Sequence, residues 1–138
     1  MLIDCGLSPN VELEKYNEFD HYLKELDMIL LSSSELEYAG ALPFIVSKYN
    51  FKGKILSTVP IKYMASLCLQ NFTSNKFPRT KFSQKQIQTF YDKCSEVNDQ
   101  IIELKFRQKI KLTVKGIGFK LECFQKGTSI GSCFWSIS

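Results

Sequence analysis

A run of three serines followed by acidic residues is the part of this sequence best suited to chemistry. Ser32-Ser33-Ser34 follows the apolar segment 28–31 and precedes Glu35 and Glu37. A serine hydroxyl becomes a nucleophile when a base, most often histidine, takes its proton. The sequence contains one histidine, His21, in a different segment among polar residues. We therefore expect a solvated His21 and no activated serine.

Three carboxylates form a second candidate site. Asp4 ends a short apolar segment, and Glu35 and Glu37 follow the serine run. If the two apolar segments are neighbouring strands, these carboxylates lie at one end of a sheet and could hold a hard cation. Acidic residues at the ends of strands and helices also serve as solvated caps, which is the favoured interpretation here.

Two other patterns do not predict sites. Gly116-Ile117-Gly118 lacks the third glycine and the lysine of a phosphate-binding loop, so we expect a hairpin turn there. The five cysteines are widely spaced and form no Cys-x-x-Cys pair, which favours buried, reduced thiols over a zinc knuckle or a disulfide framework. The cysteines are Cys5, Cys68, Cys94, Cys123 and Cys133.

The composition is that of an ordinary globular domain. The chain has 138 residues, of which 44% are hydrophobic and 23% charged. No apolar run approaches the roughly 18 residues of a membrane span, so no membrane partner is expected. The first residues lack the basic and long apolar regions of a secretory signal. The cysteine pattern favours a cytosolic or nuclear protein. The net charge of +4 is compatible with an anionic partner but does not indicate one.

Apolar periodicity predicts strands and helices in alternation up to residue 98. Strands are expected over 1–4, 28–31 and 54–57, the first of them central in its sheet because it is so hydrophobic. Amphipathic helices are expected over 13–26, over 39–49 with Asn50 at the end, over 58–72 and over 83–94. A loop is expected over 71–81. The helix over 58–72 would be capped by Thr58, and its buried stripe would be Ile61, Met64, Cys68 and Phe72.

After residue 98 the period changes from helical to two. Strands are expected over 101–104, 109–114, 119–124 and 133–137, joined as an antiparallel meander. The sequence therefore predicts an α/β domain with a mixed sheet and flanking helices. Basic residues alternate with apolar ones before and along the second strand, which predicts a basic face that could contact an RNA backbone. The candidate contacts are Lys105, Arg107, Lys109 and Lys111. A solvated or edge strand protected by lysines is the favoured interpretation of this pattern.

Two segments resemble the β-CASP branch of the metallo-β-lactamase fold. They are Leu2–Gly6 and Asp27–Pro43, the second reading DMILLSSSELEYAGALP. In active members of that family the turn reads Ser-His-x-His-x-Asp-His-x-Gly-Ala-Leu-Pro, and its His and Asp side chains bind two zinc ions. A third segment, 126–131, resembles the family's Ala-Gly-His-x-x-Gly segment, which supplies the next ligand.

The residues that flank the turn match the family pattern, whereas the residues at its ligand positions differ from it. Ser33 and Glu35 stand at the first two His positions, Glu37 at the Asp, Tyr38 at the next His, and Thr128 at the His of the third segment. Zinc prefers imidazole, thiolate and carboxylate ligands, whereas Ser, Thr and protonated Tyr hydroxyls are poor donors. The resemblance therefore implies no metal, no catalytic residues and no cofactor.

A turn that retains its flanking residues but has other residues at the ligand positions makes this chain similar to the non-catalytic β-CASP subunits of the cleavage and polyadenylation specificity factor. This resemblance implies a nuclear pseudo-nuclease that partners the catalytic endonuclease subunit and other cleavage and polyadenylation subunits, and in addition pre-mRNA. It further implies that residues 1–138 are the first half of an αββα sandwich, truncated before the β-CASP insertion. The inactive β-CASP subunit of the Integrator complex is one alternative. A metallohydrolase or RNA nuclease with substituted ligands, Asp4, Glu35 or Glu37, is another.

Overall fold

A parallel sheet forms the middle layer of the molecule. The computed structural model describes residues 1–7, 13–74 and 101–138. The strands of this sheet lie in the order β1-β2-β3-β4, and each neighbouring pair is parallel. Their bounds are Leu2–Ile3, Met28–Leu30, Lys54–Thr58 and Ile101–Leu104. Strands expected over 1–4, 28–31 and 54–57 are thereby confirmed.

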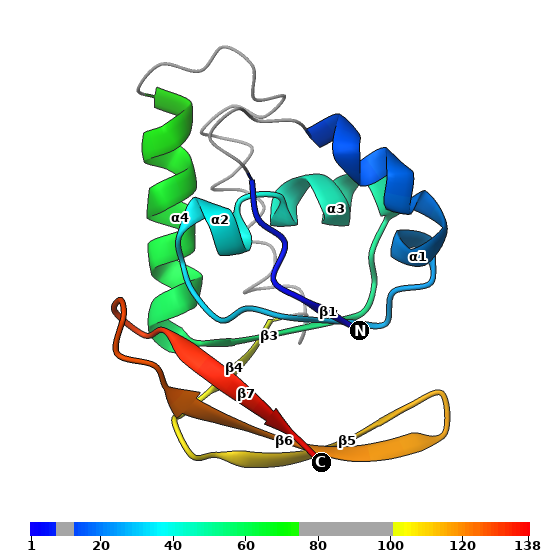
Figure 1. The fold of residues 1–138 in the computed structure, drawn as a ribbon, viewed down its shortest axis with the longest axis vertical. Coiled ribbons are helices and arrows are strands. Elements are labelled where there is room, and N and C mark those ends of the chain that lie inside the picture. The colour runs from blue at the N-terminus through cyan, green and yellow to red at the C-terminus, as the bar shows by residue number, and fades with distance from the viewer. Residues whose placement is uncertain (8–12, 75–100) are drawn as a thin grey trace.

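Helices cover one side of this sheet, and a second sheet lies on its other side (Figure 1). The helices are the 3₁₀ helix η1, Leu13–Phe19, and the α-helices α1, Asp20–Lys24, α2, Leu36–Ala39, α3, Leu42–Tyr49, and α4, Val59–Ser74. The second sheet is an antiparallel meander of β5, Lys109–Val114, β6, Ile117–Gln125, and β7, Cys133–Ile137. The described chain is therefore a layered α/β structure of helices, parallel sheet and antiparallel sheet, as the sequence predicted.

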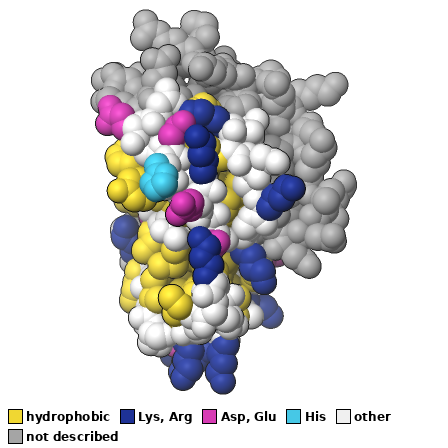
Figure 2. All heavy atoms as spheres, turned by 90° about the vertical axis from the view of Figure 1, so that its right-hand side faces the viewer, with side chains coloured by type: hydrophobic (Ala, Val, Ile, Leu, Met, Phe, Trp, Pro, Cys, Tyr) yellow, Lys and Arg dark blue, Asp and Glu magenta, His cyan; other side chains and the backbone are white. Residues whose placement is uncertain are grey.

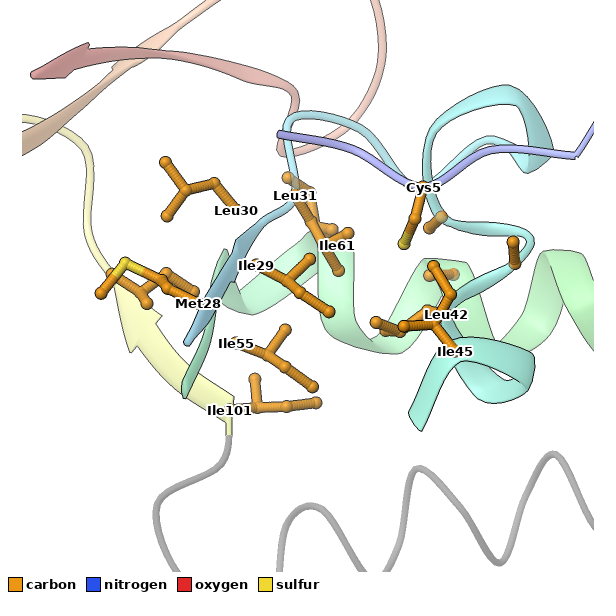
Figure 3. Close-up of a cluster of buried hydrophobic side chains, with 14 of the residues drawn as sticks. Cys5, Met28, Ile29, Leu30, Leu31, Leu42, Ile45, Ile55, Ile61 and Ile101 are labelled. Carbon is orange, nitrogen blue, oxygen red and sulfur yellow. The ribbon is translucent and has the colours of Figure 1, made fainter. Parts of the chain in front are cut away.

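The hydrophobic core fills both faces of the parallel sheet. In Figure 3, Ile29, Ile55 and Ile101 point from neighbouring strands toward the helices, and Leu30 points to the opposite side, toward the second sheet. All three residues of β2 are buried, because this strand has neighbours on both edges and layers on both faces. The continuous apolar run that predicted β2 is typical of a strand in this position.

Two of the predicted helices differ from their expected form. The segment predicted as one helix over 13–26 begins as a 3₁₀ helix and becomes α-helical only at Asp20. Phe19, the last residue of the 3₁₀ helix, is 53% exposed. In α4 the buried stripe consists of Ile61, Ala65 and Leu69 and differs from the predicted one. The helix ends at Ser74 and so includes the start of the predicted loop.

After Ile61, the predicted buried residues of α4 lie one position before the residues that are buried in the structure. Met64 and Cys68 are half-buried at its edge, and the side chain of Phe72 lies outside the described residues. The hydroxyl of Thr58, expected to cap α4, donates to the backbone oxygen of Gly131 at 2.8 Å. Residues three and four apart share a helix face, so apolar spacing alone allowed either stripe.

The region after residue 100 divides between the two sheets. β4 pairs in parallel with β3, so the prediction that it begins the meander is wrong. The antiparallel meander of β5, β6 and β7 is confirmed. The hairpin between β5 and β6 turns at Lys115 and Gly116, which have φ angles of 49° and 81°, one or two residues earlier than predicted. Two successive left-handed residues match the twist of a hairpin.

The remaining predictions on organisation have mixed outcomes. β1, expected to be central, has β2 as its one neighbour among the described strands. Asn50 ends α3 in a left-handed conformation, as expected. The helix predicted over 83–94 and most of the loop over 71–81 lie outside the described residues. No helix in the described ranges has the length and apolarity needed to span a membrane.

The described cysteines are free thiols, and three of them are buried. Cys5, Cys123 and Cys133 are at most 2% exposed, whereas Cys68 is half-buried. Burial raises the pKa of the Cys133 thiol to about 12. The expectation of buried, reduced thiols is confirmed for Cys5, Cys123 and Cys133. Cys68 is reduced but only half-buried, and Cys94 lies outside the described residues.

Candidate functional site

The serine turn lies where β2 ends, and the loop between β6 and β7 closes over it. The turn spans residues 32–35 and the loop residues 126–132. The amide of Cys133 donates to the carbonyl of Ser32 at 2.9 Å, and the Thr58 hydroxyl holds the loop at Gly131. Gly131 has a φ of +77°, and a Cβ there would lie 2.5 Å from the Cβ of Pro60. The loop is therefore fixed against the carboxyl ends of β2 and β3.

Asp4, at the end of β1, holds the first residue of the turn. Its carboxylate accepts the Ser32 amide at 2.7 Å and the Ser32 hydroxyl at 2.5 Å. Burial raises the pKa of Asp4 above its usual value, and the two hydrogen bonds from Ser32 oppose that shift. Both carboxylate oxygens are thus engaged with the turn.

The hydroxyls at two of the family's ligand positions bond to hydroxyls of the 126–132 loop. The Ser33 side chain is 2% exposed, and its Oγ lies 3.2 Å from Oγ of Ser129. Oγ1 of Thr128 donates to Oγ of Ser132 at 3.2 Å, and that hydroxyl in turn donates to the backbone oxygen of Ser129 at 2.8 Å. These polar groups satisfy one another within the protein, so they need no ligand to do so.

Backbone contacts between the end of β1 and α2 position the rest of the turn. The amide of Cys5 donates to the oxygen of Tyr38 at 2.7 Å, and the amide of Ala41 donates to the oxygen of Cys5 at 2.8 Å. Gly6 lies so close to α2 that a Cβ there would be 1.7 Å from the backbone oxygen of Glu37. The Leu2–Gly6 segment and the turn are therefore one packed unit, which explains why glycine stands at position 6.

The other candidate ligands do not point into a common centre. Glu35 and Glu37 are exposed, and the Tyr38 ring is half-buried with Nζ of Lys126 at 5.3 Å from its centroid. Glu35 precedes α2 in an extended conformation without a side-chain cap bond. The favoured expectation of solvated carboxylates agrees with the exposure of both glutamates.

The donor set does not fit a metal centre. Within residues 1–7, 13–74 and 101–138, no group of three His, Cys, Asp or Glu side chains is placed to hold a metal ion. The hypothesis that Asp4, Glu35 and Glu37 gather around a hard cation is therefore wrong, because Asp4 is turned to Ser32 while both glutamates face solvent. His21, exposed on α1 beside the Tyr22 ring at 5.7 Å, supplies neither a ligand nor a base here.

The predicted basic face is divided between a turn and a strand. Lys105 and Arg107 lie in the turn between β4 and β5, where Arg107 has a φ of +63°. Lys109 and Lys111 share the exposed face of β5, and Lys109 pairs with Glu122 across the meander at 3.7 Å. The four basic residues do not lie on one strand face, because the strand begins only at Lys109.

Three side chains of this region were missed by sequence reasoning. Ser129 bonds to Ser33 of the turn, Lys126 lies over the Tyr38 ring of α2, and Ser132 bonds to Thr128 and Ser129 within the loop. The resemblance of segment 126–131 to a ligand-bearing loop was the one signal that placed this loop at the site. Nothing in the spacing of these residues indicated which hydroxyls would pair.

Comparison with known proteins finds relatives whose similarity extends over nearly the whole chain. A probable cleavage and polyadenylation specificity factor subunit 2 from Drosophila melanogaster is 28% identical over 99% of this chain and 18% of its own length. Cleavage and polyadenylation specificity factor subunit 3 from Dictyostelium discoideum is 25% identical over 99% of this chain and 17% of its own length. Endoribonuclease YSH1 from Saccharomyces cerevisiae is 26% identical over 99% of this chain. The chain spans about 18% of the length of the YSH1 relative.

Solved structures share the fold at low identity. A metallo-beta-lactamase mutant from Cronobacter sakazakii matches with a TM-score of 0.60 and 13% identity over 99% of this chain and 48% of its own. A mutant flavo di-iron protein from Thermotoga maritima also has a TM-score of 0.60 and 13% identity, over 99% of this chain and 27% of its own. The model of the metallo-beta-lactamase superfamily domain matches residues 1–138. This match and the layered fold show that the chain belongs to the metallo-beta-lactamase superfamily.

Proposed function

We propose that this protein is a non-catalytic subunit of the nuclear machinery that cleaves and polyadenylates pre-mRNA. In this proposal it lacks a zinc centre and serves as a scaffold for the catalytic endonuclease subunit and other cleavage and polyadenylation factors. The relatives named as subunits 2 and 3 of the cleavage and polyadenylation specificity factor support the assignment to this machinery.

The observation that carries the proposal is the hydroxyl pairing at the turn. Ser33 bonds to Ser129, and Thr128 to Ser132, at positions where the resemblance expects histidine ligands. A zinc ion activates water only when its ligands hold it and leave one position open. Serine and threonine hydroxyls that bond to each other offer no such ligand set, so the turn has a structural role.

The test is the zinc content and nuclease activity of the purified full-length protein. We expect substoichiometric zinc by elemental analysis and no cleavage of an RNA substrate, because the ligand positions carry the wrong donors. The endoribonuclease YSH1 of Saccharomyces cerevisiae, prepared in the same way, is the reference. Stoichiometric zinc together with cleavage would overturn the proposal and favour the metallohydrolase alternative.

A partner test follows from the scaffold role. The tagged full-length protein should co-purify with a catalytic subunit of the cleavage and polyadenylation machinery from nuclear extract. Recovery of Integrator subunits in its place would assign the protein to the other complex.

A further inference from the structure

A basic pocket lies at the end of the parallel sheet opposite to the serine turn. It has a volume of about 490 Å³ and is lined by the residues that enter β2 and β3 and by the second half of β5. Four lysines line it, Lys52, Lys54, Lys111 and Lys115, with Asp27 as the one acidic residue of the lining. The pocket brings together three segments that are far apart in the sequence.

Three of these lysines are the candidate anion ligands. Lys115 pairs with Asp27 at 3.2 Å, so that pair is internally neutral. Lys52, Lys54 and Lys111 are exposed and have no acidic partner among the residues that the structure describes. Like charges gathered around a concave surface raise its positive potential and attract anions.

Protection of an open strand edge does not explain the cluster. Lysines on an edge strand prevent it from pairing with other chains, which accounts for Lys111 on β5. Lys54 instead begins β3, an interior strand of the other sheet, and Lys52 precedes it. Their position beside Lys111 therefore needs a different reason, and a shared anionic ligand supplies one.

The side chains around the pocket favour phosphates over a protein partner. Protein interfaces are depleted in lysine and depend on exposed aromatic or arginine anchors. This lining contains neither an aromatic residue nor an arginine, and its Met28 is buried. Lysine binds phosphate as a flexible point charge, without the fixed geometry that base recognition needs.

We propose that this pocket binds the phosphate backbone of a single-stranded RNA through Lys52, Lys54 and Lys111. The choice of RNA among polyanions rests on the proposed function in pre-mRNA processing, whereas the site itself rests on the geometry of the pocket. Of the four basic residues singled out in the sequence, only Lys111 takes part. We expect contact that is independent of the RNA sequence, because lysine charges meet phosphates and not base edges.

The experiment compares two triple variants of the full-length protein that remove the same charge. The first is Lys52→Gln, Lys54→Gln and Lys111→Gln. The control is Lys24→Gln, Lys105→Gln and Arg107→Gln, at exposed positions outside the pocket. Fluorescence anisotropy with a short labelled single-stranded RNA gives the dissociation constant over a series of salt concentrations.

The pocket variant should bind the RNA about tenfold more weakly at low salt. The slope of the logarithm of its binding constant against the logarithm of the salt concentration should decrease in magnitude by about 2, since each phosphate contact on a single strand contributes about 0.7. The control variant should bind like the unmodified protein. Equal losses in the two triples, or no loss in the first, would overturn the proposal. Tighter binding of a poly-glutamate peptide than of RNA would also overturn it, in favour of an acidic protein partner.

Two further measurements keep the result interpretable. If the pocket triple unfolds at a lower urea concentration than the control, the single variants Lys52→Gln and Lys111→Gln replace it, each with an expected slope change of about 0.7.

The zinc content of the protein separates the pocket proposal from the proposed non-catalytic function. Zinc with nuclease activity would overturn the non-catalytic role alone, whereas unchanged RNA affinity would overturn the pocket alone.

Discussion

The two ends of strands β2 and β3 use their polar residues in opposite ways. At the carboxyl ends, Ser32 and Ser33 are buried, and their hydroxyls bond to Asp4 and Ser129. At the amino ends, lysines are exposed around a pocket, and the one ion pair there leaves Lys115 61% and Asp27 35% exposed. Within the described residues, the side chains of Ser32 and Ser33 are therefore paired, whereas the lysines of the pocket other than Lys115 have no acidic partner.

The difference matters because parallel sheets usually place their ligand sites at the carboxyl ends of the strands. In this chain Asp4, Ser32 and Ser33 at that end bond to one another or to the 126–132 loop, so a ligand that contacts them would have to displace existing hydrogen bonds. At the amino end a ligand would meet three lysines without partners in the described chain. Variants that affect stability at one end and binding at the other would establish this division.

The largest stability effect is expected from Gly6→Ala at the carboxyl end. A Cβ at position 6 would be 1.7 Å from the backbone oxygen of Glu37, so β1 and α2 must move apart. Overpacking against backbone costs about 3 kcal/mol of unfolding free energy. Urea unfolding followed by circular dichroism measures the loss.

Gly118→Ala is the matched control on the meander, since a Cβ there would have no heavy atom within 4 Å. It should leave the urea midpoint unchanged or slightly raised. Similar losses for the two variants would contradict the close packing of the β1 end on α2.

An intermediate effect is expected from Asp4→Ala. The substitution leaves the buried amide and hydroxyl of Ser32 without their acceptor, which costs about 2 kcal/mol. Asp27→Ala removes a carboxylate of the same kind from the exposed pair with Lys115, which is worth about 0.5 kcal/mol or less. Equal costs for the two substitutions, measured by urea unfolding, would remove the contrast between the two ends.

The smallest effect is a pH dependence that comes from Asp4. Burial raises its folded-state pKa above the ordinary value of 3.8, so the unfolded chain releases the proton first as the pH rises. The unfolding free energy of the protein relative to Asp4→Asn should therefore be highest in acid, below about pH 4. It should decline as the pH passes through the folded-state pKa and then stay level.

Urea midpoints of the protein and of Asp4→Asn across the acid range measure this dependence. A difference that grows with rising pH would mean that the hydrogen bonds from Ser32 outweigh burial. The pKa of Asp4 would then be lowered rather than raised.

The sequence determined the local architecture and gave rise to the proposal for the turn. A continuous apolar run predicted β2, and strict alternation predicted β5. A strand buried on both faces is apolar throughout, whereas a strand buried on one face alternates apolar and polar residues. The residues flanking the turn, Leu31-Ser32 and Gly40-Ala41-Leu42-Pro43, aligned it with a family pattern in which Ser33 and Thr128 replace ligands. These conclusions needed only neighbouring positions and side-chain types.

The tertiary structure alone decided which distant groups meet. The pairing of Ser33 with Ser129 and the gathering of Lys52, Lys54 and Lys111 each join segments separated by more than 50 residues. The assignment of β4 to the parallel sheet likewise follows from its pairing with β3. Periodicity reports how a segment is buried but not against what, so contacts across the layers follow only from the three-dimensional arrangement.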